Sequence, residues 1–453
     1  MGDAKGIPVP KRDFLCFEGE NDSANEEIRS RLPTKVPIVG LGCSSFSTFF
    51  MTKEELDTNT NENSDDCVTE IKSDTLKKDH PKVQEWIQAI RYAIEECNIT
   101  LLDTAPWYGH GTSEMVVGWA LEEILAAGKI ARRDLCVNTK IGRYEADPTQ
   151  QFDFSRTKTL ESAKTSLERL SCDYIDVLQL HDPEFSPSLD ILLKETIPAL
   201  VECRSKGWCR ALGLTGYPLE VQYQILQASL EMYGSEASNK IWDQALTYGH
   251  FNLHDSSLVH RRVNPSCESF ADFCNQHTMG LLAAAPLSMG LLTNSENPEW
   301  HPANGSDLAE ACRKAATICS DLGVDIATLA LLFSMSHPKL PCTILGMKSV
   351  NEVRTAALLA KRFQVVDWSI PGMTQDLVLS FVLTFQEQKA YAILSDSENG
   401  PFAGVWKRTN ETDYDGDTTA YTPKYQWNGI REAHEFWKAL KAPFKDWQDK
   451  SFP

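Results

Sequence analysis

The sequence predicts an α/β protein folded as a closed (β/α)8 TIM barrel, with polar N-terminal insertions and a C-terminal extension. Three observations predict this fold. Eight short apolar segments, rich in β-branched residues, are spread along the chain. From the second to the seventh they begin 32 to 40 residues apart, the length of one strand, one helix and two loops. The intervening segments repeat apolar residues at helical spacing, as at Val83, Ile87, Ile90 and Ile94.

The predicted strands follow one another at 36–42, 101–105, 135–140, 175–181, 209–216, 241–248, 280–287 and 341–347. An open, doubly wound parallel sheet would also alternate strands with helices. That sheet binds dinucleotides through a GxGxxG turn after its first strand. The corresponding GLGCSS at 40–45 lacks the third glycine, which favours the closed barrel.

The predicted barrel spans 35–372. A polar segment, 1–34, precedes it, and a polar insertion at 52–80 interrupts it. Both stretches are expected on the surface, because they are too hydrophilic to bury. The extension, 373–453, is expected to pack in an ordered way because it is rich in aromatic residues, and 428–442 is predicted to be helical. Its tryptophans are Trp406, Trp427, Trp437 and Trp447.

Composition excludes several classes of partner. The 453 residues include 63 acidic and 44 basic side chains, a net charge of −19. Nucleic acids and anionic membranes both require a basic surface. No segment reaches the length of apolar sequence that spans a bilayer, and the N-terminus lacks a signal peptide, so we expect a cytoplasmic protein without membrane insertion. Thirteen cysteines without a CxxC pair predict reduced thiols and no metal site.

Four polar residues stand at or just after the ends of consecutive predicted strands: Asp103, Tyr108, Lys140 and His181. Strand ends of this kind carry the active site of a TIM barrel. Alone, each could be structural, as a turn cap, a packed aromatic, a surface lysine or a core histidine. Together they predict proton transfer. Lys140 would lower the pKa of Tyr108 from about 10, Asp103 would hold the lysine, and His181 would orient the substrate oxygen.

The motifs around these residues resemble the aldo-keto reductases, and most closely their L-galactose, L-fucose and D-arabinose dehydrogenases. They are LLDTAPWYGHGTSE, NTKIGRY, YIDVLQLHDPEF, GLTGYPL and SMGLLTNSENPEWHPA. The resemblance covers about 36–370 and implies a TIM barrel, a nicotinamide cofactor and a catalytic tetrad of Asp103, Tyr108, Lys140 and His181.

The reaction that the resemblance implies is NAD(P)-dependent oxidation of an aldose, an L-galactose-like sugar, at its anomeric carbon to an aldonolactone. Two alternatives stay open. One is a general aldehyde reductase. The other is a cofactor-binding regulatory subunit, such as a potassium-channel β subunit. The expected partner is a small sugar or aldehyde, and the sequence predicts no oligomeric state.

The resemblance also implies cofactor-binding residues. Thr215 and Gly216 stand where the family holds the nicotinamide carboxamide. Lys348, Ser349 and Arg354, in GMKSVNEVRTAALL, resemble its phosphate pocket. A loop that opens a helix after the eighth strand is also a phosphate site on physical grounds. Two cations and a hydroxyl suit a 2′-phosphate, so we expect NADP to be preferred to NAD.

Two further pairs are expected near the tetrad. Trp107 and His110 flank Tyr108 and are expected to line the sugar pocket, although packing alone would also explain them. Gln179 and Asn138 should face the barrel interior beside the catalytic strand ends, because side chains alternate along a strand.

Overall fold

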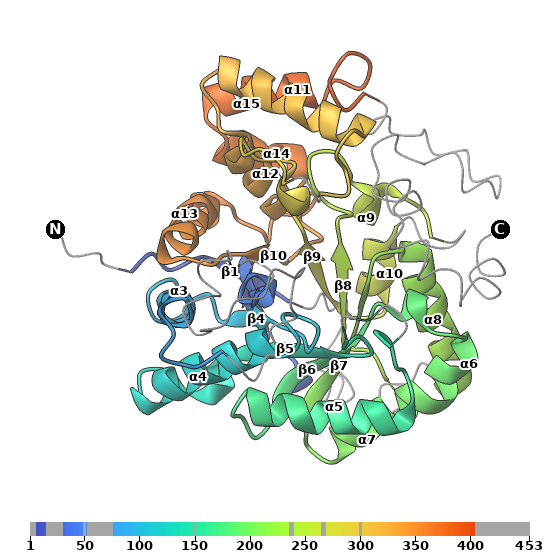
Figure 1. Ribbon diagram of the computed structural model, residues 1–453. Helices are drawn as coiled ribbons and strands as arrows, with labels where there is room; N and C mark the ends of the chain where they lie inside the picture. The colour runs from blue at the N-terminus through green and yellow to red at the C-terminus, as the bar shows by residue number, and fades with distance from the viewer. Residues whose placement is uncertain are drawn as a thin grey trace, which may run out of the picture.

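The computed structural model describes residues 6–14, 30–48, 51, 76–145, 147, 150–234, 240–263, 269–298 and 301–403. Eight parallel strands close into a barrel with helices around it (Figure 1). Each strand lies within a predicted segment or within one residue of it, so the predicted barrel is confirmed and the open sheet is excluded. The strands are β3 (Val39–Gly42), β4 (Leu101–Asp103), β5 (Cys136–Ile141), β6 (Ile175–His181), β7 (Cys209–Gly216), β8 (Gln244–Tyr248), β9 (Gly280–Ala284) and β10 (Cys342–Gly346).

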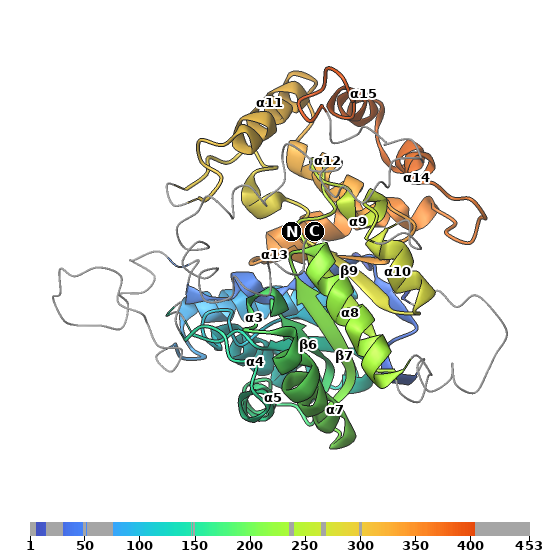
Figure 2. The ribbon, with the colours of Figure 1, turned by 90° about the vertical axis from the view of Figure 1, so that its right-hand side faces the viewer.

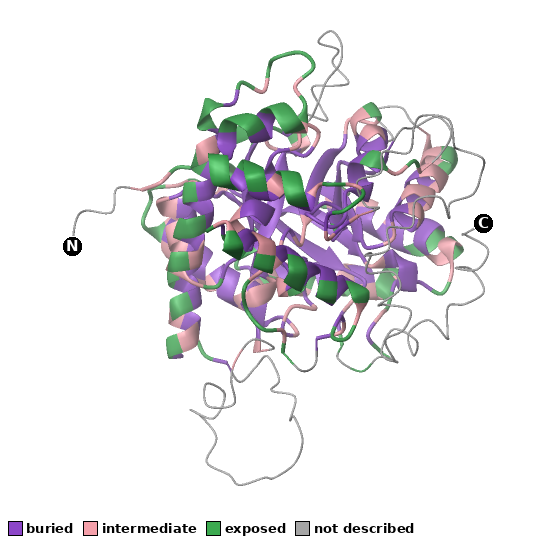
Figure 3. Cartoon of the chain, turned by 90° about the horizontal axis from the view of Figure 1, so that it is seen from above, coloured by how far each residue is buried: buried purple, intermediate pink, exposed green. Residues whose placement is uncertain are grey.

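Helices follow every barrel strand. In α3 the four residues at helical spacing, from Val83 to Ile94, are all buried, and His80 caps the helix start. Figure 3 shows the same pattern throughout, with buried strands and exposed outer faces on the helices. The helices are α3 (Pro81–Glu95), α4 (Thr112–Ala126), α5 (Arg156–Arg169), α6 (Leu189–Ile191), α7 (Ile197–Ser205), α8 (Leu219–Tyr233), α9 (Ser257–His260), α10 (Phe270–Gln276), α11 (Asp307–Asp321), α12 (Ile326–Met335) and α13 (Val350–Lys361).

The N-terminal segment differs from the surface stretch that we expected. β1 (Lys11–Asp13) pairs antiparallel with β2 (Lys35–Pro37), and Phe14 is buried in an apolar cluster with residues of strands β4 to β10. A Cβ added to Gly280 would lie 2.6 Å from the Phe14 ring, so β9 leaves room for this aromatic plug. Arg12 is buried too, and donates to the carbonyls of His337 and Leu340 at 3.1 and 2.7 Å.

The expected insertion is described only at its end. Residues 52–75 lie outside the described part of the chain. Leu76 and His80 are buried, contrary to the expectation of a wholly exposed stretch, because they pack at the start of α3.

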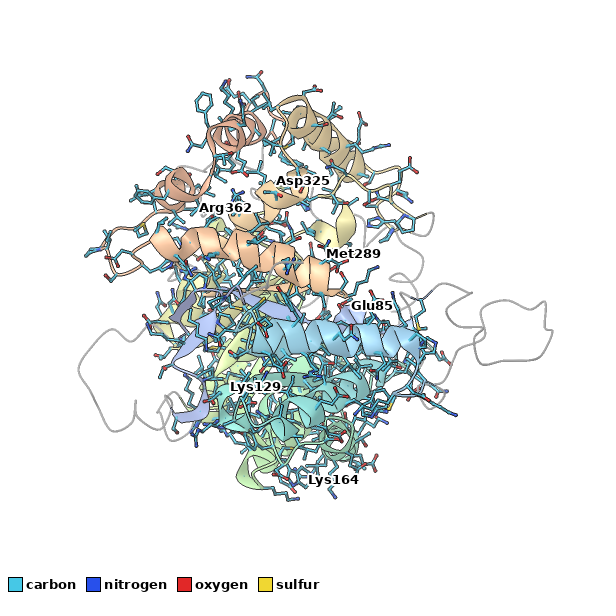
Figure 4. The ribbon with its side chains drawn as sticks, turned by 90° about the vertical axis from the view of Figure 1, so that its left-hand side faces the viewer. Glu85, Lys129, Lys164, Met289, Asp325 and Arg362 are labelled. Atoms are coloured by element: carbon cyan, nitrogen blue, oxygen red, sulfur yellow. The ribbon has the colours of Figure 1, made fainter. Side chains whose placement is uncertain are left out.

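Two helices of the C-terminal extension are described, α14 (Gln375–Val382) and α15 (Phe385–Leu394). Together with α11 they lie on one side of the barrel, away from α5 and α7 (Figure 2). Arg362, labelled in Figure 4, follows α13 and donates to both carboxylate oxygens of Glu387 at 2.9 and 2.8 Å. Phe402 is fully buried. The four tryptophans and the helix predicted at 428–442 lie outside the described residues.

Within the described ranges, no single helix is long and apolar enough to cross a membrane, although α11 and α12 pass together as a pair bent by 105°.

Candidate active site

The barrel brings the four predicted catalytic residues together. Asp103 and His181 are the last residues of β4 and β6, Lys140 lies in β5, and Tyr108 lies in the loop before α4. The strands run parallel in neighbouring register, with His181 paired to Thr215 of β7. Their carboxyl ends therefore meet at one end of the barrel, where the chemistry of this fold is found.

Lys140 is the centre of the group. Its Nζ donates to Asp103 Oδ2 at 2.6 Å, to the Thr104 carbonyl at 2.8 Å and to the Tyr108 hydroxyl at 3.2 Å. An ammonium has three donors, so these bonds fix its position. Burial opposes its charge, but attraction by Asp103 and Tyr108 outweighs burial and places the pKa of Lys140 above its ordinary value.

Asp103 is supported from the far side of the barrel. Gln179 donates to Asp103 Oδ1 at 2.7 Å, and Gln244 of β8 donates to Gln179 at 3.2 Å. The expectation that Gln179 faces inward is confirmed, as is that for Asn138, which is buried and accepts from the Cys136 thiol. The role of Gln244 was not predicted, although a glutamine within an otherwise apolar strand indicates a buried hydrogen bond.

The pKa of Tyr108 differs from the sequence prediction. Burial raises it, the Lys140 ammonium lowers it and the Asp103 carboxylate raises it again, so that the pKa lies above its ordinary value. The sequence prediction considered only the ammonium, whereas desolvation of the phenolate is the largest effect. The phenol therefore keeps its proton near neutral pH.

His181 completes the site as a neutral group. Burial lowers its pKa to about 3. Its ring lies 6.2 Å from the Tyr108 ring, nearly perpendicular at 85°. Its Nδ1 is buried and has no hydrogen-bond partner within the described ranges. A neutral imidazole can donate one hydrogen bond and accept another, so His181 can donate to a substrate oxygen.

Trp107 and His110 contact the loop after β5. Their rings lie 5.2 Å apart, and His110 donates to the Tyr144 carbonyl at 3.0 Å. The guanidinium of Arg143 covers the Trp107 ring at 4.2 Å. Both side chains are half-buried, so their contact with a substrate stays a prediction.

An ion pair that the sequence reasoning did not single out lies beside the tetrad. Arg143 Nη1 lies 2.7 Å from Asp182 Oδ2, and the same oxygen is 3.7 Å from His181 Nε2. The signal was present, because both residues stand inside the motifs NTKIGRY and LQLHDPEF.

The predicted carboxamide site adjoins His181. Thr215 is buried at the end of β7, and its carbonyl accepts from the backbone N–H of Asp182 at 2.8 Å. A Cβ added to Gly216 would lie 2.8 Å from Glu184 Oε2. A larger residue at this position would therefore press on the buried Glu184 carboxylate.

The predicted phosphate pocket lies at the start of α13. Ser349 caps the helix by accepting from the Glu352 N–H, while Lys348 and Arg354 are exposed. Arg354 Nε donates to the Tyr92 hydroxyl at 3.3 Å. The Glu352 carboxylate, which was not predicted, accepts from the Lys348 N–H at 2.7 Å. Cations and a helix N-terminus fit a dinucleotide phosphate, and Glu352 offsets part of that charge.

Comparison with known proteins decides the family. The family model described as "Aldo/keto reductase family" matches residues 74–369. The chain belongs to the aldo/keto reductase family. It is 35% identical over 255 residues to L-galactose dehydrogenase of Arabidopsis thaliana, covering 56% of this chain and 72% of that protein. It is 31% identical over 281 residues to D-arabinose 1-dehydrogenase of Saccharomyces cerevisiae, covering 61% and 77%.

A solved structure supports the fold. Glycerol dehydrogenase from Gluconobacter oxydans matches with a TM-score of 0.52 at 20% sequence identity, over 82% of this chain and 94% of that one. Together the family and the fold identify this aldo/keto reductase as an NAD(P)-dependent oxidoreductase.

Proposed function

We propose that this aldo/keto reductase oxidises an aldose at its anomeric carbon to an aldonolactone and prefers NADP to NAD. The observation that carries the proposal is the buried ammonium of Lys140, 3.2 Å from the Tyr108 hydroxyl and 2.6 Å from Asp103. The similarity to L-galactose dehydrogenase and D-arabinose 1-dehydrogenase supports an aldose as substrate.

In this mechanism Tyr108 takes the proton of the anomeric hydroxyl. Lys140 stabilises the phenolate that must form, and Asp103 keeps the ammonium charged and aimed. Neutral His181 donates a hydrogen bond to the reacting oxygen. A nicotinamide cofactor held beside Thr215 and Gly216 would supply the acceptor for the hydride that leaves the anomeric carbon. Because burial raises the pKa of Tyr108, oxidation should accelerate as the pH rises toward that pKa, and carbonyl reduction should slow.

The cofactor residues follow from the same strand ends. Thr215 and Gly216 would hold the carboxamide beside His181. Lys348, Ser349 and Arg354 would hold the phosphate at the start of α13. Lys348, just before the N-cap Ser349, and Arg354, the fifth residue of α13, support a preference for the extra 2′-phosphate of NADP. We also propose a cytoplasmic location, which thirteen scattered cysteines without a CxxC pair support.

The test is turnover across a substrate panel. Purified protein is given NADP or NAD with L-galactose, L-fucose or D-arabinose, and cofactor reduction is followed by absorbance. Reduction of simple aldehydes by NADPH is measured in parallel. Oxidation of at least one aldose is expected, with higher kcat/KM than simple aldehydes show in reduction. Turnover of aldehydes alone would refute the proposal.

A further inference from the structure

The ion pair of Arg143 and Asp182 lies at the open end of the barrel. Asp182 directly follows His181, the last residue of β6. The two side chains keep 11% and 16% of their exposure, so the pair borders solvent. Asp182 is also within electrostatic reach of the phenol. Burial is the largest cause of the raised pKa of Tyr108, and the negative charge of Asp182 raises it a little further.

The backbone holds the Asp182 carboxylate in place. Asp182 has left-handed dihedral angles, φ 48° and ψ 52°, which a non-glycine residue adopts at an energetic cost. Such residues cluster at functional sites. The Asp182 N–H donates to the Thr215 carbonyl at 2.8 Å, which anchors the turn to β7.

Arg143 is equally constrained. Its guanidinium lies 4.2 Å from the centre of the Trp107 ring and 5.4 Å from that of Phe152. The backbones of Arg143 and Phe152 are joined by an antiparallel bridge. The arginine therefore presents a fixed donor to Asp182, and the carboxylate is oriented before any substrate arrives.

We propose that Asp182, oriented by Arg143, accepts a hydrogen bond from the sugar hydroxyl next to the reacting carbon, so that the site selects aldoses over carbonyl compounds without that hydroxyl. This inference rests on the proposed function. The reacting oxygen must lie between Tyr108 and His181. A hydroxyl one carbon away then reaches a carboxylate oxygen that is 3.7 Å from His181 Nε2.

The chemistry suits a hydroxyl donor. A carboxylate has about four acceptor sites, so Asp182 can accept from a sugar hydroxyl as well as from Arg143. Hydrogen bonds to a charged acceptor are roughly twice as strong as neutral ones. A site built to bind a hydroxyl discriminates against analogues that lack it, because its polar group is then left without its partner.

The experiment compares an aldose with its 2-deoxy analogue. Values of kcat/KM for D-arabinose and L-galactose, each against its 2-deoxy form, are measured in the wild type and in Asp182→Asn and Asp182→Ala. The wild type should favour the full aldose by about ten- to a hundredfold, the range of a hydrogen bond to a charged group. Both variants should lower that ratio several-fold, chiefly by raising KM for the aldose.

The matched control lies at the other end of the same strand. Asp176 near the start of β6 pairs with Arg132 at 2.7 Å, the distance of the Arg143–Asp182 pair. Asp176→Asn should leave the ratio at its wild-type value, even if it lowers the melting temperature. Arg143→Lys should lower the ratio less than Asp182→Ala, because the acceptor is kept but its orientation is weakened.

Several results would overturn the inference. If the wild type turns over an aldose and its 2-deoxy form with equal kcat/KM, that result alone overturns the inference. Equal losses on both substrates in the Asp182 variants would show that the ion pair only fastens the loop after β5. Wild-type protein that oxidises no aldose would instead overturn the proposed function, and the inference with it.

Discussion

Replacing Lys140 by methionine removes an ammonium that lies 3.2 Å from the Tyr108 hydroxyl. Unit charges at this separation attract by about 5 kcal/mol at an effective dielectric constant of about 20. One pKa unit corresponds to about 1.4 kcal/mol, so we expect the pKa of Tyr108 to rise by up to about 3–4 units. Oxidation near neutral pH should then fall by roughly 10²–10⁴, the range of general acid–base catalysis.

The substitution also leaves Asp103 without its cation. The Asp103 side chain is 4% exposed, and removing one partner of a buried pair costs about 3–5 kcal/mol. Unfolding could therefore mimic a catalytic defect. The double variant Lys140→Met/Asp103→Asn removes both charges and should recover most of the lost stability, while the phenol still lacks its ammonium.

The assay is the initial rate of aldose oxidation from about pH 6 to about pH 10. This range ends at the ordinary pKa of a phenol, about 10, and lies below the raised pKa of Tyr108. Thermal melting is measured on the same samples. In both variants the rate should rise only at more alkaline pH than in the wild type. A folded double variant with wild-type activity and an unshifted pH profile would show that Lys140 does not act on Tyr108.

Four further substitutions have expected outcomes. Tyr108→Phe should lower turnover by at least about 10²–10⁴ and leave dinucleotide affinity within a few-fold, as fluorescence titration can show; wild-type turnover would exclude the tyrosine as the proton carrier. Phe14→Ala should lower the free energy of unfolding by about 3–5 kcal/mol in urea titrations, because it empties a buried aromatic site; an unchanged midpoint would mean that the plug is dispensable. Glu352→Gln should strengthen NADP binding about two- to fivefold relative to NAD, from the ~0.5–1 kcal/mol of an exposed charge pair, whereas Arg354→Ala should weaken NADP selectively. Equal changes for both cofactors would place the 2′-phosphate elsewhere.

The barrel could be predicted because its signals are local. A short apolar strand rich in β-branched residues and a helix with a repeating apolar face are each visible within one short window. Asp103, Lys140 and His181 stand at or near strand ends, which parallel closure brings together. Tyr108 follows β4 by five residues, in the loop before α4. Gln179 followed from strand alternation alone.

Other features depend on contacts that no short window contains. Phe14 and Arg12 lie in a polar stretch, and their burial requires β9 and the 337–340 turn, which are more than 260 residues away along the chain. Such long-range and side-chain geometry had to come from the structure.

The pKa of Tyr108 shows why the residue types in the site were not enough to predict its protonation. An ammonium beside a phenol lowers the phenol's pKa only if its attraction exceeds the cost of burying the phenolate. Here burial is the larger effect. Gln179 and Lys140 each donate to one oxygen of Asp103, and attraction by Asp103 and Tyr108 outweighs burial and raises the pKa of Lys140. The buried pair thus fixes an ammonium at the phenol without releasing the phenol's proton, so the proton can move in either direction when a sugar or a carbonyl compound lies against His181.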